Sequence, residues 1–210
     1  MNPLRVAFST AARFAGPFGV VLLLAAAVLV PPAFAEPAPG FNAKSIDGSP
    51  QNLSDLKGKI VILEWFNPGC PFVKRLYDDK SMQALQREYT GKGFHWITVN
   101  STSSDHRDYL NEEETKAVMK KWGLSSSGFI VDADGEIGRT YGAKTTPTIV
   151  IIGKNGELLY QGAPDNYPEV KDTSAAAKPY LKDVLIEIDA GKTPSIPETK
   201  VYGCSIKYRT

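Results

Sequence analysis

The sequence of 210 residues contains two cysteines, Cys70 and Cys204, and these are the side chains best suited to covalent chemistry. Cys70 follows an apolar run, Ile60–Phe66, and an Asn-Pro-Gly turn, and Pro71 after it suits the first turn of a helix. A thiol at a helix N-terminus is acidified, because the helix dipole and the unpaired amides stabilise the thiolate. We therefore expect Cys70 to act as a nucleophile.

Cys204 lies near the C-terminal end, and the sequence leaves two roles open for it. It is either a resolving thiol that attacks an oxidised Cys70, or one half of a permanent disulfide with Cys70. A permanent disulfide across so long a loop would contribute up to ~4–5 kcal/mol in the chain-entropy model. It would also remove Cys70 from chemistry, so the two roles exclude each other. A resolving thiol on another subunit or protein is a further alternative.

Glu64 lies within the apolar run that precedes Cys70. It is either a buried carboxylate that relays protons, with a pKa raised by burial, or a solvated acid at the strand end. The two histidines, His95 and His106, are far apart, and neither has a cysteine or acid at metal-ligand spacing. The sequence therefore predicts no metal site, and we expect no organic cofactor.

The first 35 residues have the features of a secretory signal peptide. Arg5 and Arg13 precede an apolar run, Gly19–Val30, and Ala33-Phe34-Ala35 is a small-x-small cleavage site. The apolar run is shorter than the ~20 residues of a membrane-spanning helix. We expect cleavage after residue 35, a periplasmic location and no membrane attachment afterwards. The remaining charge is nearly balanced, which argues against nucleic-acid binding.

The rest of the chain alternates between strand and helix patterns. After a Pro-rich leader at 36–40, interpreted as a flexible tether, strands are expected at Ile60–Phe66, Phe94–Val99, Phe129–Val131, Thr148–Ile152 and Leu158–Gln161. Helical patterns follow Cys70, Ser81, Asn111 and Pro179, and a short helical piece is expected at Ile137–Tyr141. Alternation of this kind predicts an α/β fold with a parallel core, and the Asn-Gly turn at 155–156 adds an antiparallel hairpin edge.

Four segments of the chain resemble motifs of the thioredoxin-like redoxin superfamily, and most closely its peroxiredoxin-like (AhpC/TSA-like) and TlpA-like secreted branch. They are Glu64-Trp65-Phe66, Cys70-Pro71-Phe72-Val73-Lys74, Thr145-Thr146-Pro147-Thr148 and Gly203-Cys204-Ser205-Ile206-Lys207. The resemblance implies a thioredoxin-like three-layer fold over 41–192, a mixed sheet with helices on both faces, and a tail at 193–210 that carries Cys204.

The resemblance also assigns roles to individual residues. Cys70 and Cys204 would be the nucleophilic and candidate resolving cysteines, and Glu64 the candidate proton relay. Thr146 and Pro147 would form a cis-proline loop that binds substrate backbone, with Pro71 beside the substrate groove. Trp65 would either floor this groove or pack in the core.

Two positions depart from the family motifs. Val73 stands where the second cysteine of Cys-x-x-Cys would be, and Asn67 stands where peroxiredoxins have Thr or Ser. These departures count against a complete Cys-x-x-Cys centre and against efficient peroxide reduction.

We therefore expect a secreted thiol redox protein, a thiol–disulfide oxidoreductase or antioxidant, that needs no cofactor. Its partners would be protein or small-molecule disulfides, or peroxides, together with an external thiol reductant. A thiol peroxidase is one alternative. A non-catalytic binding module with a structural Cys70–Cys204 disulfide is another.

Overall fold

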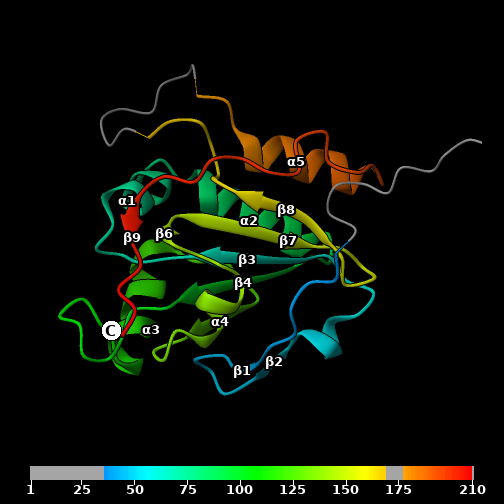
Figure 1. Ribbon diagram of the computed structural model, residues 1–210. Helices are drawn as coiled ribbons and strands as arrows, with labels where there is room; N and C mark the ends of the chain where they lie inside the picture. The colour runs from blue at the N-terminus through cyan, green and yellow to red at the C-terminus, as the bar shows by residue number, and fades with distance from the viewer. Residues whose placement is uncertain (1–35, 169–176, 210) are drawn as a thin grey trace, which may run out of the picture. The chain divides into compact units, whose positions relative to one another are not determined.

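The structure is a computed structural model that describes residues 36–168 and 177–209. A mixed sheet of five strands in the order β5-β4-β3-β7-β8 forms its centre (Figure 1). β3 pairs in parallel with β4, and β4 with β5, whereas β7 runs antiparallel to both β3 and β8. The predicted parallel core with an antiparallel hairpin edge is confirmed. The bounds are β3 (Val61–Trp65), β4 (His95–Asn100), β5 (Gly128–Val131), β7 (Thr148–Ile152) and β8 (Leu158–Gly162).

The central strand β3 is buried along its whole length, as its continuous apolar sequence predicts. Alternation places Ile62 and Phe66 in one core cluster, and Leu63 and Trp65 in the other, on the opposite face of the sheet. Glu64, between Leu63 and Trp65, therefore faces the same side as Ile62 and Phe66.

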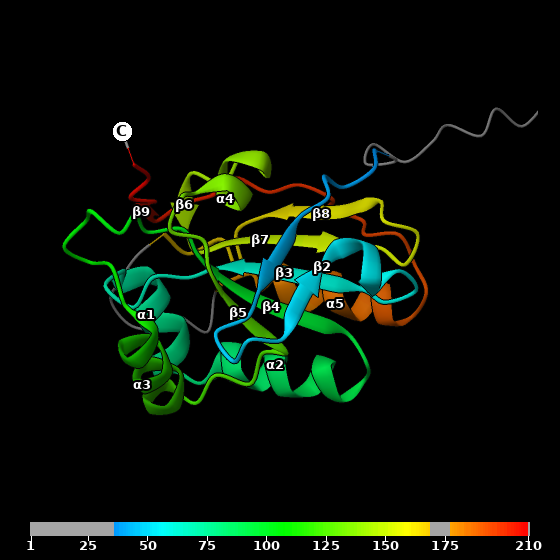
Figure 2. The same ribbon diagram turned by 90° about the horizontal axis from the view of Figure 1, so that it is seen from below.

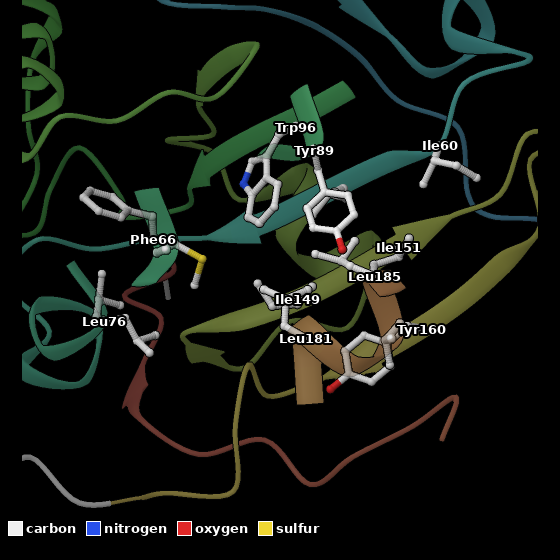
Figure 3. Packing of buried hydrophobic residues seen from close by; sticks show 14 of the residues in the cluster. Ile60, Phe66, Leu76, Tyr89, Trp96, Ile149, Ile151, Tyr160, Leu181 and Leu185 are labelled. Atoms are coloured by element: carbon white, nitrogen blue, oxygen red, sulfur yellow. The ribbon is translucent and has the colours of Figure 1, made fainter. Parts of the chain in front are cut away.

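Four helices cover the first face. They are α1 (Pro71–Asp78), α2 (Ser81–Gly91), α3 (Glu112–Trp122) and α5 (Tyr180–Asp189). Figure 3 shows Leu181 and Leu185 of α5 beside Ile149 of β7, with Phe66 and Trp96 in the same layer. α3 begins with a capping box, in which Asn111 accepts a hydrogen bond from the backbone N–H of Glu114 and the Glu114 carboxylate accepts one from the backbone N–H of Asn111.

The second face carries shorter elements, so the predicted helices on both faces are confirmed but are unequal in length (Figure 2). They are the hairpin of β1 (Asn42–Lys44) and β2 (Pro50–Asn52), the 3-10 helix η1 (Leu53–Leu56) and α4 (Glu136–Thr140). Tyr141 at the end of α4 packs against Phe41 and Trp65 in this second core.

The Pro-rich leader was expected to be a flexible tether, but its first residues are bound to the β7–β8 hairpin. The backbone N–H of Leu158 donates to the carbonyl of Glu36, that of Ala38 donates to the carbonyl of Gly156, and Pro37 forms a bridge with Glu157. The leader is thus bound to the β7–β8 hairpin. Among the helices in the described ranges, none combines the length and hydropathy of a membrane-crossing segment. The predicted signal peptide, 1–35, lies outside the described residues.

The C-terminal tail also lies on the sheet rather than away from it. Residues 197–199 run beside β8, where the backbone N–H of Gln161 donates to Pro197 and that of Thr199 donates to Gln161. Beyond this point β9 (Cys204–Ser205) pairs antiparallel with β6 (Thr145–Thr146), in the loop before β7. Figure 1 shows this path in red, from α5 past β8 to β6.

Candidate thiol site

A tight turn between β3 and α1 presents Cys70. Asn67 shapes this turn, because its side-chain oxygen accepts a hydrogen bond from the backbone N–H of Gly69 and its amide donates to the hydroxyl of Thr102. The backbone N–H of Cys70 donates to the carbonyl of Asn67. Cys70 is the N-cap residue of α1, with Pro71 in the first turn as predicted, and its side chain is buried, with 1% of its surface exposed.

The loop before β7 lies against the sulfur of Cys70. The Thr146–Pro147 peptide bond is cis, as the sequence predicts for this loop. The carbonyl oxygen of Thr146 accepts a hydrogen bond from the Cys70 thiol, with 3.2 Å between sulfur and oxygen. Cys70 and Thr146 are 76 positions apart in sequence and meet because β3 and β7 are neighbours in the sheet.

The second cysteine reaches the same place from the C-terminal tail. Cys204 stands opposite Thr146 in the β6–β9 pair, and its side chain packs against the core cluster that contains Cys70. The two cysteines are free thiols in this structure, and they lie close enough for each to shift the pKa of the other. The fold therefore brings together the two side chains on which the sequence-based hypothesis depends.

The environment moves the pKa values of the two thiols in opposite directions. Burial raises the pKa of Cys70, but the polar groups beside the sulfur, namely the Thr146 hydroxyl, Cys204 and the backbone N–H of Val73, outweigh it and hold the pKa below its ordinary value of 9.0. The Thr146 hydroxyl is buried and has no hydrogen-bond partner among the described residues, so it is available to a Cys70 thiolate. The Thr146 carbonyl opposes ionisation, since it accepts a hydrogen bond only from the protonated thiol.

Burial, the neighbouring Cys70 sulfur and the charge of Cys70 raise the pKa of Cys204 to about 12. Cys70 is therefore the more acidic thiol of the two. Opposite shifts of this kind are typical of paired groups with different chemical roles.

A glycine allows the tail to approach the loop this closely. Gly203 has φ +121°, and a Cβ placed on it would lie 1.9 Å from the carbonyl oxygen of Thr146 and 3.3 Å from Cδ of Pro147. The obstructing atoms belong to the backbone and a proline ring, so they have little freedom to move. Any larger residue at 203 would hold Cys204 away from Cys70.

A buried ion pair anchors the tail just before Gly203. Arg75 of α1 and Asp165 form a salt bridge of 2.9 Å, with 6% and 10% of their side chains exposed. The Tyr202 hydroxyl accepts a hydrogen bond from Arg75 and donates one of 2.5 Å to Asp165. Its ring also packs edge-on against Phe72 of α1.

Further contacts hold the tail after Cys204. The backbone N–H of Ile206 donates to the carbonyl of Lys144, and the Tyr208 hydroxyl donates to the carbonyl of Ala143. The carbonyl of Lys207 accepts a hydrogen bond from the backbone N–H of Ser103. Anchors on both sides therefore align Cys204 with Thr146.

Glu64 is fully buried beneath the helices of the first face, so the alternative of a solvated acid is wrong. Its carboxylate accepts hydrogen bonds of 2.8–2.9 Å from the Tyr77 hydroxyl, the Gln86 amide and the Trp96 indole. Burial raises the pKa of Glu64, and these three donors oppose the rise only in part. No hydrogen bond among the described residues joins Glu64 directly to Cys70, so its role as a proton relay stays a prediction.

Two other candidates lie in different surroundings. Pro71 is exposed at the start of α1, beside Cys70. Trp65 is fully buried in the second core, where its indole donates to the hydroxyl of Ser101 and packs against Tyr141. The predicted place of Trp65 beside a substrate groove is therefore wrong, because strand alternation turns its side chain to the opposite face of the sheet from Cys70. In the described ranges, no three His, Cys, Asp or Glu side chains cluster as a metal site would require.

Sequence reasoning missed the residues that hold the tail. Gly203 beside Cys204 was a local signal, since glycine marks close backbone approach. Tyr202, Arg75 and Asp165 gave no signal, because their pairing joins three distant parts of the chain. The Asn-Pro-Gly sequence predicts the turn before Cys70, but the hydrogen bond from Gly69 to the Asn67 side chain that shapes this turn was not predicted.

Comparison with known proteins agrees with this geometry. The Redoxin family profile matches residues 33–178. The thioredoxin-like protein YneN of Bacillus subtilis (strain 168) is 28% identical over 121 residues, which cover 58% of this chain and 66% of YneN. The thiol-disulfide oxidoreductase ResA of Bacillus anthracis is 29% identical over 125 residues, 59% of this chain and 66% of ResA. The chain thus spans just under two thirds of the length of these curated relatives.

Solved structures share the fold. A hypothetical protein, SMc02350 of Sinorhizobium meliloti 1021, has a TM-score of 0.73 at 21% identity, covering 84% of this chain and 95% of its own. A putative thioredoxin from Neisseria meningitidis has a TM-score of 0.52 at 25% identity, covering 73% and 87%. With the matched profile, the mixed sheet and the cis-proline loop, the chain belongs to the Redoxin family of thioredoxin-like proteins.

Proposed function

We propose that the protein is a periplasmic thiol–disulfide oxidoreductase in which Cys70 is the attacking thiolate and Cys204 the resolving thiol. The observation that carries the proposal is the contact between the two thiols, whose pKa values are shifted in opposite directions. The name of the relative ResA, a thiol-disulfide oxidoreductase, supports the same class of reaction. The periplasmic location rests on the signal-peptide features of residues 1–35.

The reaction proceeds in two exchanges. The Cys70 thiolate attacks one sulfur of a substrate disulfide, the substrate S–S bond breaks, and the other substrate sulfur leaves as a thiolate. Cys204 then attacks the Cys70 sulfur of this mixed disulfide and releases the second substrate thiolate. The substrate gains two electrons, and the protein is left with a Cys70–Cys204 disulfide, which an external dithiol reduces while becoming a disulfide itself.

The first exchange also prepares Cys204 for the second. The interaction with the Cys70 sulfur and the negative charge of Cys70 are, after burial, the main causes of the raised pKa of Cys204. Both disappear when Cys70 enters the mixed disulfide. Cys204 therefore becomes easier to deprotonate at the stage at which it must attack, while the nearby Lys207 favours its thiolate.

The cis-proline loop and the buried acid have supporting roles in this proposal. Thr146 and Pro147 would align the substrate backbone, with exposed Pro71 beside it. Glu64 would act as a buried proton reservoir behind the site, on the Cys70 side of the sheet.

The direct test is thiol mapping by mass spectrometry together with reduction of an insulin disulfide by the full chain. Wild-type protein should form a Cys70–Cys204 bond that dithiothreitol opens readily. Cys70→Ser should abolish insulin reduction, and Cys204→Ser should stop after the mixed disulfide. A Cys70–Cys204 bond that resists reduction would instead establish the binding-module alternative. Rapid, saturable loss of the Cys70 thiol with hydrogen peroxide would favour the peroxidase alternative.

A further inference from the structure

The docked tail closes the surface of the proposed nucleophile. Cys70 has 1% of its surface exposed, although attack on a protein disulfide requires the sulfur to meet a substrate sulfur. The tail covers this place, because Cys204 pairs with Thr146, whose carbonyl accepts from the Cys70 thiol, and the Cys204 side chain packs against the core cluster that contains Cys70. A substrate therefore has no approach to Cys70 through the place where the tail lies.

The tail has the arrangement expected of a bound substrate strand. It is extended, runs antiparallel to β6 and carries a cysteine opposite Thr146 whose sulfur contacts Cys70. In the proposed function, Thr146 and Pro147 receive the backbone of an extended polypeptide. Tail and substrate would then use the same backbone groups of a two-residue strand, and they cannot pair with β6 at the same time.

The anchors keep the tail close even when β9 leaves β6. Residues 197–199 remain paired beside β8, so Cys204 stays tethered near the site. A tethered group returns at a high effective concentration. The tail can thus leave β6 when a substrate binds there, and later displace the substrate from β6 without diffusing back from solution.

We propose that the tail, residues 201–209, is a built-in substrate-like strand that exchanges with an external one. When docked, it shields Cys70. An extended polypeptide segment that carries a disulfide replaces it on β6, and the returning tail expels this segment as Cys204 resolves the mixed disulfide. The identity of the exchanging segment as a substrate rests on the proposed function, whereas the shielding of Cys70 by the tail does not.

The shielding is measured by the alkylation rate of Cys70 with iodoacetamide in a Cys204→Ser background, which leaves one reactive thiol. Adding Gly203→Ala places a methyl group against the Thr146 carbonyl and should undock β9. We expect alkylation at least about tenfold faster, because local opening no longer limits access. The matched control is Gly93→Ala, which also replaces a glycine of positive φ (+88°) but has nothing within 4 Å. With this control, the alkylation rate of Cys70 should equal that of the Cys204→Ser variant alone.

A second variant keeps the inference testable if Gly203→Ala alters folding. Tyr202→Ala in the same background removes the contacts with Arg75, Asp165 and Phe72 and should also accelerate alkylation. Circular dichroism verifies that each variant is folded. Unchanged alkylation in folded forms of both variants would overturn the proposal.

Strand exchange makes a second prediction that a purely structural tail does not share. With insulin as the probe, Gly203→Ala/Cys204→Ser should form the mixed disulfide faster than Cys204→Ser. Gly203→Ala alone should turn over more slowly than wild type, because the displaced tail no longer resolves. If Gly203→Ala slowed both the formation of the mixed disulfide and the turnover of insulin, the proposed strand exchange would be contradicted. If Cys70→Ser still reduced insulin, the proposed function would fail, and the alkylation result would remain valid for the shielding.

Discussion

Cys204 stands opposite Thr146 in the antiparallel pair of β6 and β9, and the carbonyl of Thr146 accepts the hydrogen bond of the Cys70 thiol. One loop residue therefore connects the start of α1 with the C-terminal tail. Val73 stands where the family motif has its second cysteine, and in the folded chain Cys204 of the tail lies near Cys70 instead.

Cys204 should contribute measurably to the acidity of Cys70. Burial raises the pKa of Cys70, and the neighbouring Thr146 hydroxyl and Cys204 thiol lower it below 9.0. Cys204→Ala should therefore raise the pKa of Cys70, measured from the ultraviolet absorbance of the thiolate during a pH titration. Cys204→Ser keeps a donor and should raise it less. Equal values in Cys204→Ala and the wild type would contradict this assignment.

Replacing Glu64 should change how stability depends on pH. Burial raises the pKa of Glu64 above its ordinary value of 4.5, so the folded state keeps a proton that the unfolded state has lost. The free energy of unfolding should then fall as pH rises from 4.5 through the raised pKa of Glu64. The decrease should end once the pH lies above that pKa.

Glu64→Gln removes this titration. The free energy of unfolding of the variant, relative to wild type, should grow with pH over that interval, as measured by urea unfolding at a series of pH values. Titration of the other groups cancels in the comparison. Parallel curves for the two proteins would show that Glu64 has an ordinary pKa in the folded state.

The Arg75–Asp165 pair should be important for stability because it is buried. Arg75→Met leaves the Asp165 carboxylate without its cation, which should cost about 3–5 kcal/mol in the free energy of unfolding. The surface pair of Lys116 and Glu112 is the control, with 52% and 67% of the side chains exposed. Lys116→Met should cost less than about 1 kcal/mol in the same urea titration. Similar costs for both variants would mean that Arg75 is effectively solvated.

Asn67 should be a positioning residue for Cys70. Asn67→Ala removes the hydrogen bond from the backbone N–H of Gly69 and loosens the turn before Cys70, so insulin reduction should slow by about 10- to 100-fold. Asn111→Ala is the control, because it also removes an asparagine side chain that accepts a backbone hydrogen bond, here the cap of α3. Loss of this cap should cost ~1 kcal/mol in stability. It should leave the rate nearly unchanged. A similar slowing in both variants would attribute the effect to stability alone.

Much of the fold was predictable because its signals are local. The continuous apolar run of β3, the Asn-Gly turn after β7 and the cap at Asn111 each act within a few residues, and the observed elements agree with them. Cys70 was recognisable for the same reason, since its turn, its helix start and Pro71 are adjacent in sequence.

The sequence by itself thus determined the sheet, the helices and the place of Cys70 at the start of α1. Only the tertiary structure decided what surrounds Cys70. β6 and β9 are two-residue strands, too short for a periodic pattern, and their pairing joins segments far apart in sequence. The burial of Glu64 depends on Tyr77, Gln86 and Trp96 from three other elements. The contact of Cys204 with Cys70 depends on the missing Cβ of Gly203, whose importance appears only once the carbonyl of Thr146 is in place.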